Sequence, residues 1–364
     1  MADTIRITCV GDTMPGGILH YEEGNFCSNE VLDILQKADI RVATLETAVG
    51  DEPNFDEEKM NRDKDVIYCP TKDLSRLSEL GINVVSLANN HAWDLGYNGI
   101  EYTMHELDKL GISYCGAGKS IVEASKPAVV TIKGKSVAFI AYCDNNPGTC
   151  GYIPVATNRS PGINAAIPEN IRHNIATFKR KYDYLFVLMH WGKEYYYYPT
   201  PEVNSLARKM IDWGVDGVIG SHSHQIQPTI FYKNKPIIFS LGNFFFPDRI
   251  ITAPRSTYYP EECPDLKSIP HTLGYPFVKE PTFKIWKSVA RKGQIISIII
   301  NNDFLSYERY FTEINEKSHI YLSSNSNHIL FKLSHDLVNL PFYKLLFTGL
   351  RGCRFILKKY KGEL

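Results

Sequence analysis

The sequence lacks three patterns that would each define a class of protein. No stretch of about 18 uncharged apolar residues occurs, so no transmembrane helix is predicted. The cysteines are irregularly spaced and form no CxxC pair, which excludes zinc-knuckle and dithiol redox motifs. No basic and apolar leader precedes the first strand-like residues near Thr4, and we therefore expect a cytoplasmic location.

The sequence also lacks a net charge. Lys and Arg together number 40, as do Asp and Glu, so global charge gives no reason to expect a nucleic-acid partner. The chain of 364 residues is 44% hydrophobic and 22% charged, which is typical of a globular protein with a substantial core. This length allows one large domain or two.

Apolar runs of strand length alternate with stretches of helical period along roughly the first 250 residues. The predicted strands are Ile5–Val10, Arg41–Leu45, Asn83–Leu87, Ser136–Tyr142, Tyr184–Met189, Gly217–Ile219 and Pro236–Leu241. The helical stretches between them begin near Ser28, Thr71, Tyr97, Pro168 and Pro201. Near-continuous apolar strands separated by helices predict an α/β fold with a largely parallel sheet that is covered on both faces.

The final third of the chain has a different character. Residues 248–281 are rich in Pro, Tyr and charge without a clear period, which predicts a long loop or lid. Gln294–Ile300 and Phe304–Phe311, separated by Asn-Asn-Asp, predict a terminal hairpin. We expect one domain over residues 1–312 and a basic helical tail over 313–364. The tail either packs on its own domain or contacts a partner or the membrane surface.

Polar side chains follow the predicted strands at the point where each strand ends. They are Asp12, Glu46, Asn90 with His91, His190, His222 with His224, and Asn243. Because the carboxyl ends of parallel strands lie along one edge of a sheet, these side chains can meet in one crevice. Carboxylates, an amide and imidazoles, without thiolates, are typical ligands of divalent metals. Of this set, we expect Asn243 to clamp the loops rather than bind a metal.

The spacing within these motifs carries further expectations. His222 and His224 are two residues apart on a segment expected to be extended, so both rings would project to the same side. Asp94, three residues after His91, is placed to accept its ring N–H and to fix the tautomer. The residues expected to line the entrance of the crevice and contact substrate are Lys193, Glu194 and Tyr195.

The order and spacing of these motifs resemble the capsule-synthesis CapA family, the poly-gamma-glutamate biosynthesis proteins of the calcineurin-like metallophosphatase superfamily. The likeness covers roughly residues 5 to 246. It is carried by Gly11-Asp12, Leu45-Glu46, Ala88-Asn89-Asn90-His91, His190-Trp191-Gly192, His222-Ser223-His224 and Gly242-Asn243-Phe244. The resemblance implies an α/β sandwich of two mixed sheets flanked by helices, with one or two divalent ions per chain (Mn, Zn or Fe).

The resemblance also assigns roles by position. Asp12 and His224 would serve a first metal, and Glu46 would bridge both metals. The second metal would be completed by Asn90, His190 and His222. His91 would be the catalytic proton donor to the leaving group. The superfamily's opening Asp-x-His motif has Met14 at its histidine position here, and a thioether is a poor ligand for hard metals.

Simpler roles stay open for several of these residues. Glu46 can instead cap a following helix, and Asn90 can form a left-handed turn. His190 can be a satisfied core histidine, and the histidines of residues 222–224 can be ordinary polar groups at a strand end. The Tyr195–Tyr198 run is more typical of packing than of substrate contact.

Two functions are consistent with this pattern. The first is a metal-dependent hydrolase of phosphoester or amide bonds in capsule, exopolysaccharide or poly-gamma-glutamate biosynthesis, acting on a polymer intermediate or a small phosphoester. The alternative is a non-catalytic accessory subunit of a polymer synthase that keeps the crevice for binding, which Met14 and the basic tail motivate. Both imply contact with capsule-synthesis machinery, and the tail would place a cytoplasmic protein at the membrane periphery.

Overall fold

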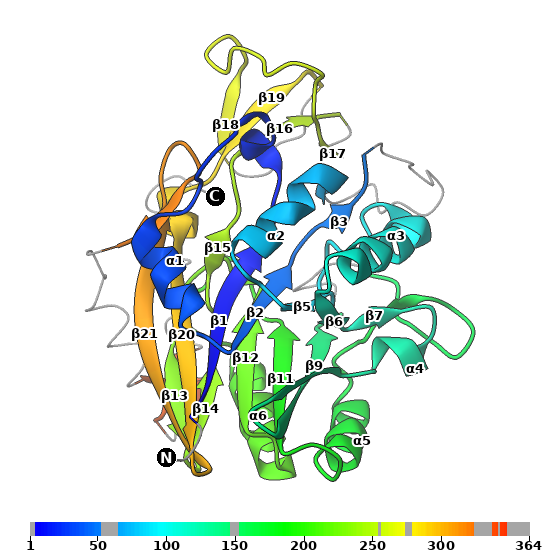
Figure 1. Ribbon diagram of the computed structural model, residues 1–364, viewed down its shortest axis with the longest axis vertical. Coiled ribbons are helices and arrows are strands. Elements are labelled where there is room, and N and C mark those ends of the chain that lie inside the picture. The colour runs from blue at the N-terminus through cyan, green and yellow to red at the C-terminus, as the bar shows by residue number, and fades with distance from the viewer. Residues whose placement is uncertain are drawn as a thin grey trace.

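The computed structural model describes residues 4–51, 65–145, 153–253, 256–273, 279–323, 337–340 and 343–347. Within these residues, two mixed β-sheets stack face to face and helices cover their outer faces (Figure 1). This architecture confirms the expected α/β sandwich of two mixed sheets flanked by helices.

The first sheet is built around β1 (Ile5–Thr13). Its other strands are β22 (Ile320–Leu322), β21 (Phe304–Ile314), β20 (Lys292–Asn301), β2 (Ile40–Leu45), β5 (Val84–Ser86), β6 (Ser113–Cys115) and β15 (Asn243–Phe245). The strand order is β22-β21-β20-β1-β2-β5-β6, and β15 also pairs with β1. Strand β1 runs parallel to β2 and β15 but antiparallel to β20. The predicted terminal hairpin is confirmed as β20 and β21.

The second sheet has the order β13-β14-β12-β11-β9-β8. Its strands are β13 (Thr229–Tyr232), β14 (Lys235–Ile238), β12 (Gly217–Ser221), β11 (Tyr184–His190), β9 (Lys135–Cys143) and β8 (Ala128–Ile132). Successive side chains of a strand point to opposite faces. Phe139 and Phe186 accordingly lie in the core shared with the first sheet, whereas Ile140 and Val187 lie in the core under the helices. The runs predicted as strands from Ile5 to Leu241 thus all contribute strands to the two sheets.

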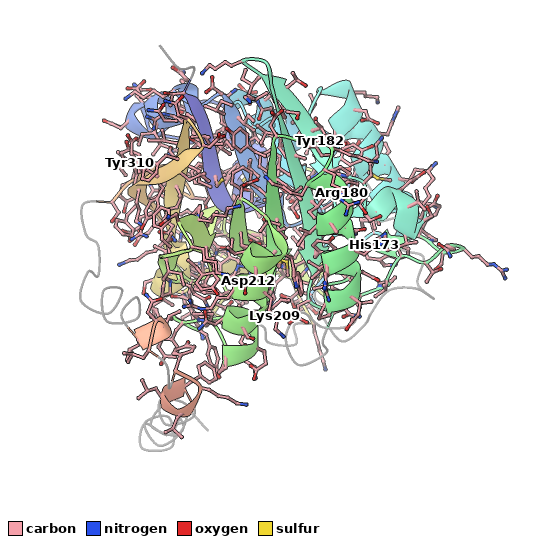
Figure 2. The ribbon with its side chains drawn as sticks, turned by 90° about the horizontal axis from the view of Figure 1, so that it is seen from below. His173, Arg180, Tyr182, Lys209, Asp212 and Tyr310 are labelled. Atoms are coloured by element: carbon pink, nitrogen blue, oxygen red, sulfur yellow. The ribbon has the colours of Figure 1, made fainter. Side chains whose placement is uncertain are left out.

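Helices cover both outer faces of the sandwich. They are α1 (Asn29–Gln36), α2 (Ser75–Glu79), α3 (Gly96–Lys109), α4 (Ile121–Ala124), α5 (Pro168–Phe178) and α6 (Pro201–Trp213), with 3-10 segments η1 (Gly17–Tyr21), η2 (Thr71–Leu74) and η3 (Ser288–Arg291). Helices α1 to α3 lie on the first sheet, and α5 and α6 lie on the second (Figure 1). Seen from below, α5 with His173 and α6 with Lys209 and Asp212 run side by side (Figure 2).

Residues 248–281, expected to be a loop or lid, contain short strands. These are β16 (Arg249–Thr252), β17 (Ser256–Thr257) and β18 (His271–Leu273), which join β19 (Thr282–Ile285) in the order β17-β16-β19-β18. We call these four strands the cap sheet; it stands beyond the carboxyl ends of β1 and β2 (Figure 1). Strands this short, with mixed polar and apolar residues, give no usable period in the sequence. Two small ladders join β3 (Ala48–Val49) to β4 (Tyr68–Cys69) and β7 (Ala117–Gly118) to β10 (Gly162–Ile163).

Most of the predicted basic tail lies outside the described residues. Its described part includes Val338, Tyr343 and Phe347, which are buried in the core cluster of the second sheet and α6. The Tyr343 hydroxyl donates a hydrogen bond to the carbonyl of Pro199. This part of the tail therefore packs on its own domain. In the described residues, no helix has both the length and the apolar character required to cross a bilayer.

Candidate metal centre

A β-bulge positions Asp12. Strand β1 carries one extra residue relative to β2 just before Asp12, and bulges of this kind redirect the side chain that follows. A Cβ atom on Gly11 would lie 1.8 Å from the carbonyl oxygen of Gly242, so only glycine fits there. The N–H of Asp12 donates to that same oxygen at 3.0 Å. The Asp12 carboxylate is buried and accepts the backbone N–H of His222 at 3.2 Å.

Glu46 lies between two imidazoles that come from different strand ends. It follows β2, its N–H donates to the carbonyl of Thr13 at 2.9 Å, and its side chain is fully buried. Its Oε1 atom lies 3.6 Å from Nε2 of His190 and 3.7 Å from Nε2 of His224. The short strand β3, not a helix, follows Glu46, so the helix-capping alternative is wrong.

His190, at the end of β11, faces side-chain oxygen and nitrogen atoms of two other strand-end residues. Its Nε2 atom lies 2.6 Å from Oδ1 of Asn90 and 3.0 Å from Nδ1 of His222. Its Nδ1 atom lies 3.0 Å from Oγ of Ser221, which fixes the other side of the ring. The backbone of Asn90 is not left-handed, so the turn alternative does not account for this residue. Its amide oxygen points at the imidazole as the ligand role requires.

The extended backbone expected for residues 222–224 is wrong. Strand β12 ends at Ser221, and φ is 89° at His222 and 50° at His224. Non-glycine residues are uncommon in this left-handed region, and such strain gathers at functional sites. The tight turn still brings the rings together, with their centres 6.2 Å apart. The two imidazoles therefore converge because of a strained turn and not because of strand alternation.

Asn243 holds His224 in one tautomer. Nδ1 of His224 donates to Oδ1 of Asn243 at 2.8 Å, and Nδ2 of Asn243 donates to the carbonyl of Ala290 at 2.8 Å. Because Nδ1 carries the proton, Nε2 offers its lone pair on the side of Glu46. Asn243 was expected to clamp loops; its hydrogen bonds join the His224 turn to Ala290 and also orient this imidazole.

The side chains fit two cations that share one carboxylate. Glu46, His190 and His222 form one group and Asp12, Glu46 and His224 form another, and in each group the ligand atoms lie within 4.8 Å of one another. All five residues are buried. Buried lone pairs brought this close together are costly unless a cation lies between them. Carboxylate and imidazole donors suit Zn, Mn or Fe.

The electrostatics of the cluster agree with this assignment. Burial, reinforced by the charge of Glu194, raises the pKa of Asp12 to about 7, although the His222 N–H opposes that shift. Burial and the neighbouring His222 lower the pKa of His224 well below its ordinary value. The His224 imidazole is therefore neutral, and the Asp12 carboxylate resists ionisation when no cation is near. A bound cation would favour both the neutral imidazole and the ionised carboxylate, as a metal site requires.

The predicted contact between His91 and Asp94 is present. Nδ1 of His91 lies 2.5 Å from Oδ2 of Asp94, and this oxygen also accepts the N–H of Ile67 at 2.7 Å. The backbone N–H of His91 donates to Oδ1 of Asn89 at 2.9 Å. Because Nδ1 is fixed by the carboxylate, Nε2 is the ring atom that can exchange a proton with a substrate.

The loop after His190 supplies the predicted entrance residues. Lys193, Glu194 and Tyr195 are all half-buried in it. The N–H of Tyr195 donates to the carbonyl of Ser223 at 2.7 Å, and its ring centre lies 6.0 Å from that of His224. Tyr195 therefore contacts the metal centre directly.

The tyrosines that follow have a different role. The rings of Tyr196 and Tyr198 lie 6.4 Å and 6.2 Å from the ring of Phe347 in the tail. Both tyrosines pack against the core cluster of the second sheet. Tyr196 and Tyr198 therefore serve packing, as the sequence favoured, whereas Tyr195 lies at the edge of the site.

Met14 is part of the apolar core. Its side chain is fully buried in the cluster under the first sheet, and its N–H donates to the carbonyl of Phe245 at 2.6 Å. Sequence reasoning missed three residues that complete the site's surroundings. These are Ser221, which contacts His190, and the cap-sheet cations Arg249 and Lys284. The motif around His222 could have indicated Ser221, but no local pattern marks the other two.

A two-sheet α/β sandwich with carboxylate, amide and imidazole groups gathered at the strand ends is the class of fold and site that the sequence resemblance implied. The family is narrower than the fold. Residues 6–248 match the family model described as "Bacterial capsule synthesis protein PGA_cap", and the chain belongs to this family.

Sequence similarity to individual proteins agrees with this family assignment. The chain is 29% identical over 250 residues to "PGA biosynthesis protein CapA" of Bacillus subtilis and 28% identical over 256 residues to "Capsule biosynthesis protein CapA" of Bacillus anthracis. These matches cover 67% of this chain in both cases, and 64% and 60% of the two relatives. The chain thus spans less than two thirds of their length. A 5'-nucleotidase precursor of Thermus thermophilus is similar in structure with a TM-score of 0.43 and 13% identity, covering 87% of this chain and 56% of that one.

Proposed function

We propose that this chain is a metal-dependent hydrolase of the phosphoesterase type that acts in capsule or poly-glutamate synthesis. The observation that carries the proposal is the position of Glu46 in both ligand groups, within 4 Å of imidazoles from two different strand ends. A carboxylate shared by two divalent ions is the arrangement that clamps a phosphoryl centre.

The residues of the site have separate roles in this reaction. When bound, the divalent ions supply Lewis acidity and activate water. Asp12, Glu46, Asn90 and the three imidazoles would hold those ions, and the loop of Lys193 to Tyr195 borders the place where substrate would bind. His91, oriented by Asp94, donates the proton that the leaving oxygen needs. Asn243 and Ser221 keep the imidazoles in the tautomer that leaves a lone pair for the metal.

The test is hydrolysis of bis(p-nitrophenyl) phosphate by protein loaded with Mn²⁺, Zn²⁺ or Fe²⁺. We expect metal-dependent turnover that His190→Ala and His222→Ala abolish. A matched control is His173→Ala, which removes a histidine of α5 on the face opposite the cap sheet (Figure 2). Turnover that survives both alanine variants would remove the mechanism.

Met14 supports a second candidate, a non-catalytic accessory subunit that uses the crevice for binding. A buried thioether replaces the imidazole expected for the first metal, which leaves that group with Asp12, Glu46 and His224. A relative in Mycobacterium tuberculosis, 28% identical over 224 residues, is named "Probable polyglutamine synthesis accessory protein". Metal that binds fully without turnover of any phosphodiester or gamma-glutamyl amide would favour this candidate, whose partner is the synthesis machinery.

A further inference from the structure

Two buried basic side chains face each other on the cap sheet. Arg249 of β16 and Lys284 of β19 are register partners in an antiparallel ladder, so their side chains stand on the same face. They are only 1% and 2% exposed. Like charges directly opposite one another destabilise a sheet, and burial adds a desolvation cost. Such an arrangement needs a compensating anion.

Asp65 compensates only part of this charge. Its Oδ2 atom accepts a hydrogen bond from Nζ of Lys284 at 2.7 Å. The same oxygen lies 3.6 Å from Nη2 of Arg249, which is too far for a hydrogen bond. In the described part of the chain, Nε, Nη1 and Nη2 of Arg249 all lack a hydrogen-bond partner. A guanidinium has five N–H donors, and leaving them buried and unused is costly.

Aromatic rings connect Arg249 to the metal centre. Its Cζ atom lies 5.6 Å from the ring centre of Trp286 and 5.8 Å from that of Phe246. The ring centre of His224 lies 5.3 Å from that of Trp286 and 5.7 Å from that of Phe246. The guanidinium is therefore one aromatic layer away from a metal-ligating imidazole.

A third basic residue, Lys287, lies between the cap sheet and the entrance residues. Nζ of Lys287 lies 5.9 Å from the ring centre of Tyr195, the entrance residue whose N–H bonds to Ser223. The cap sheet that carries Arg249 and Lys284 stands over the carboxyl ends of β1 and β2, where the ligand groups gather (Figure 1). Arg249, Lys284 and Lys287 thus place three basic side chains on this side of the centre.

We propose that Arg249, with Lys284 beside it, is an oxyanion-binding subsite of this centre. It takes a carboxylate or phosphoryl group that the substrate carries in addition to the group at the metals. The planar fork of a guanidinium binds either oxyanion through two parallel hydrogen bonds, which a lysine cannot do. The proposal rests on the proposed function, because it takes the ligand of Arg249 to be the substrate of the metal centre. It restricts that substrate to molecules that carry a second anionic group.

The test compares anion binding by full-length, metal-loaded variants in isothermal titration calorimetry. The probes are inorganic phosphate and glutarate. We expect Arg249→Met to lower the affinity for the preferred probe about 10- to 100-fold and Arg249→Lys to lower it less, with metal content unchanged. Arg309→Met, which removes a half-buried arginine of the β21 hairpin, is the control and should bind as the wild type does. Preference for phosphate identifies a phosphoryl group, and preference for glutarate identifies a carboxylate.

Thermal unfolding separates this role from a structural one. Because the guanidinium of Arg249 is buried without hydrogen bonds, Arg249→Met should leave the Tm unchanged or raised. A lowered Tm with unchanged anion affinity overturns the proposal. If Arg249→Met does not fold, Arg249→Lys decides, and wild-type affinity in that variant overturns it.

The two proposals can fail separately. Anion binding that depends on Arg249 in a protein without hydrolytic activity refutes the hydrolase and supports the subsite. Metal-dependent hydrolysis with anion affinity that is the same in all variants refutes the subsite alone.

Discussion

Nδ1 of His224 donates a hydrogen bond to Oδ1 of Asn243 at 2.8 Å, and through it the loop at Ala290 holds the His224 ring in place. Removing such an orienting partner typically weakens metal affinity 10- to 100-fold. We expect Asn243→Ala to show a loss of this size at the Asp12–Glu46–His224 group. Metal titration by calorimetry measures it. Asn204→Ala, which removes a buried amide of α6 that donates to the carbonyl of Val338 at 3.2 Å, is the control; equal losses in the two variants would show that the effect is general destabilisation.

Glu46 belongs to both ligand groups, whereas His224 belongs to one. Glu46→Ala should therefore abolish binding of both metals, and His224→Ala should leave one metal on Glu46, His190 and His222. Elemental analysis of the metal-to-protein ratio after reconstitution distinguishes the two variants. Full occupancy in Glu46→Ala would exclude a shared carboxylate.

Met14 offers a gain-of-function variant. It stands two residues after Asp12, in the position where the sequence resemblance implies a histidine. Met14→His should supply an imidazole to the first group and tighten its metal binding at least tenfold, since imidazole replaces a poor ligand. Calorimetry with Mn²⁺ or Zn²⁺ tests this. Met14→Leu, which keeps the apolar volume, should bind as the wild type does, and a matching gain in that variant would contradict the ligand role.

Burial raises the pKa of Asp12 in the metal-free protein to about 7, above its value of about 3.9 in an unfolded chain. Stability associated with the protonated form is present at low pH and is lost as the pH rises through about 7. A bound cation removes that loss because it stabilises the carboxylate. We therefore expect Mn²⁺ to raise the Tm more at pH 8 than at pH 6, as measured by differential scanning fluorimetry. An equal increase at both pH values, or the same pH dependence in Asp12→Asn, would speak against this origin.

His91 and Asp94 should affect turnover and not metal content. Loss of a general acid lowers kcat about 100- to 10,000-fold, so we expect a loss in this range for His91→Ala. Asp94→Asn should have a smaller effect, because the imidazole remains but its tautomer is no longer fixed. Steady-state kinetics beside metal analysis check both points. If either variant loses its metals, its role lies in the ligand groups instead.

The strand-end residues could be predicted from the sequence because parallel strands bring their carboxyl ends to one edge. Asp12, Glu46 and His190 follow long apolar runs that leave little doubt about the strands. The bend at His222 and His224 could not be predicted, because backbone strain at a non-glycine residue is imposed by surrounding contacts.

The cap sheet was missed for a different reason. Its strands are only two to four residues long. Arg249 is a buried basic residue in a segment whose composition indicates a loop, and Lys284 follows just after that segment. Only the pairing of residues 35 positions apart places these two cations side by side. Long-range register of this kind has no local signature.

Strand β20 begins more than 40 residues after the family match ends at residue 248, yet it forms one whole flank of β1, with Ile5 opposite Ile300 and Cys9 opposite Ile296. A fragment cut at the match boundary would leave this flank of β1 as an open edge that can recruit strands from other copies. Such a fragment should aggregate on expression. A shortened version intended for crystallisation or assay therefore has to extend at least through Ile314, the end of the hairpin.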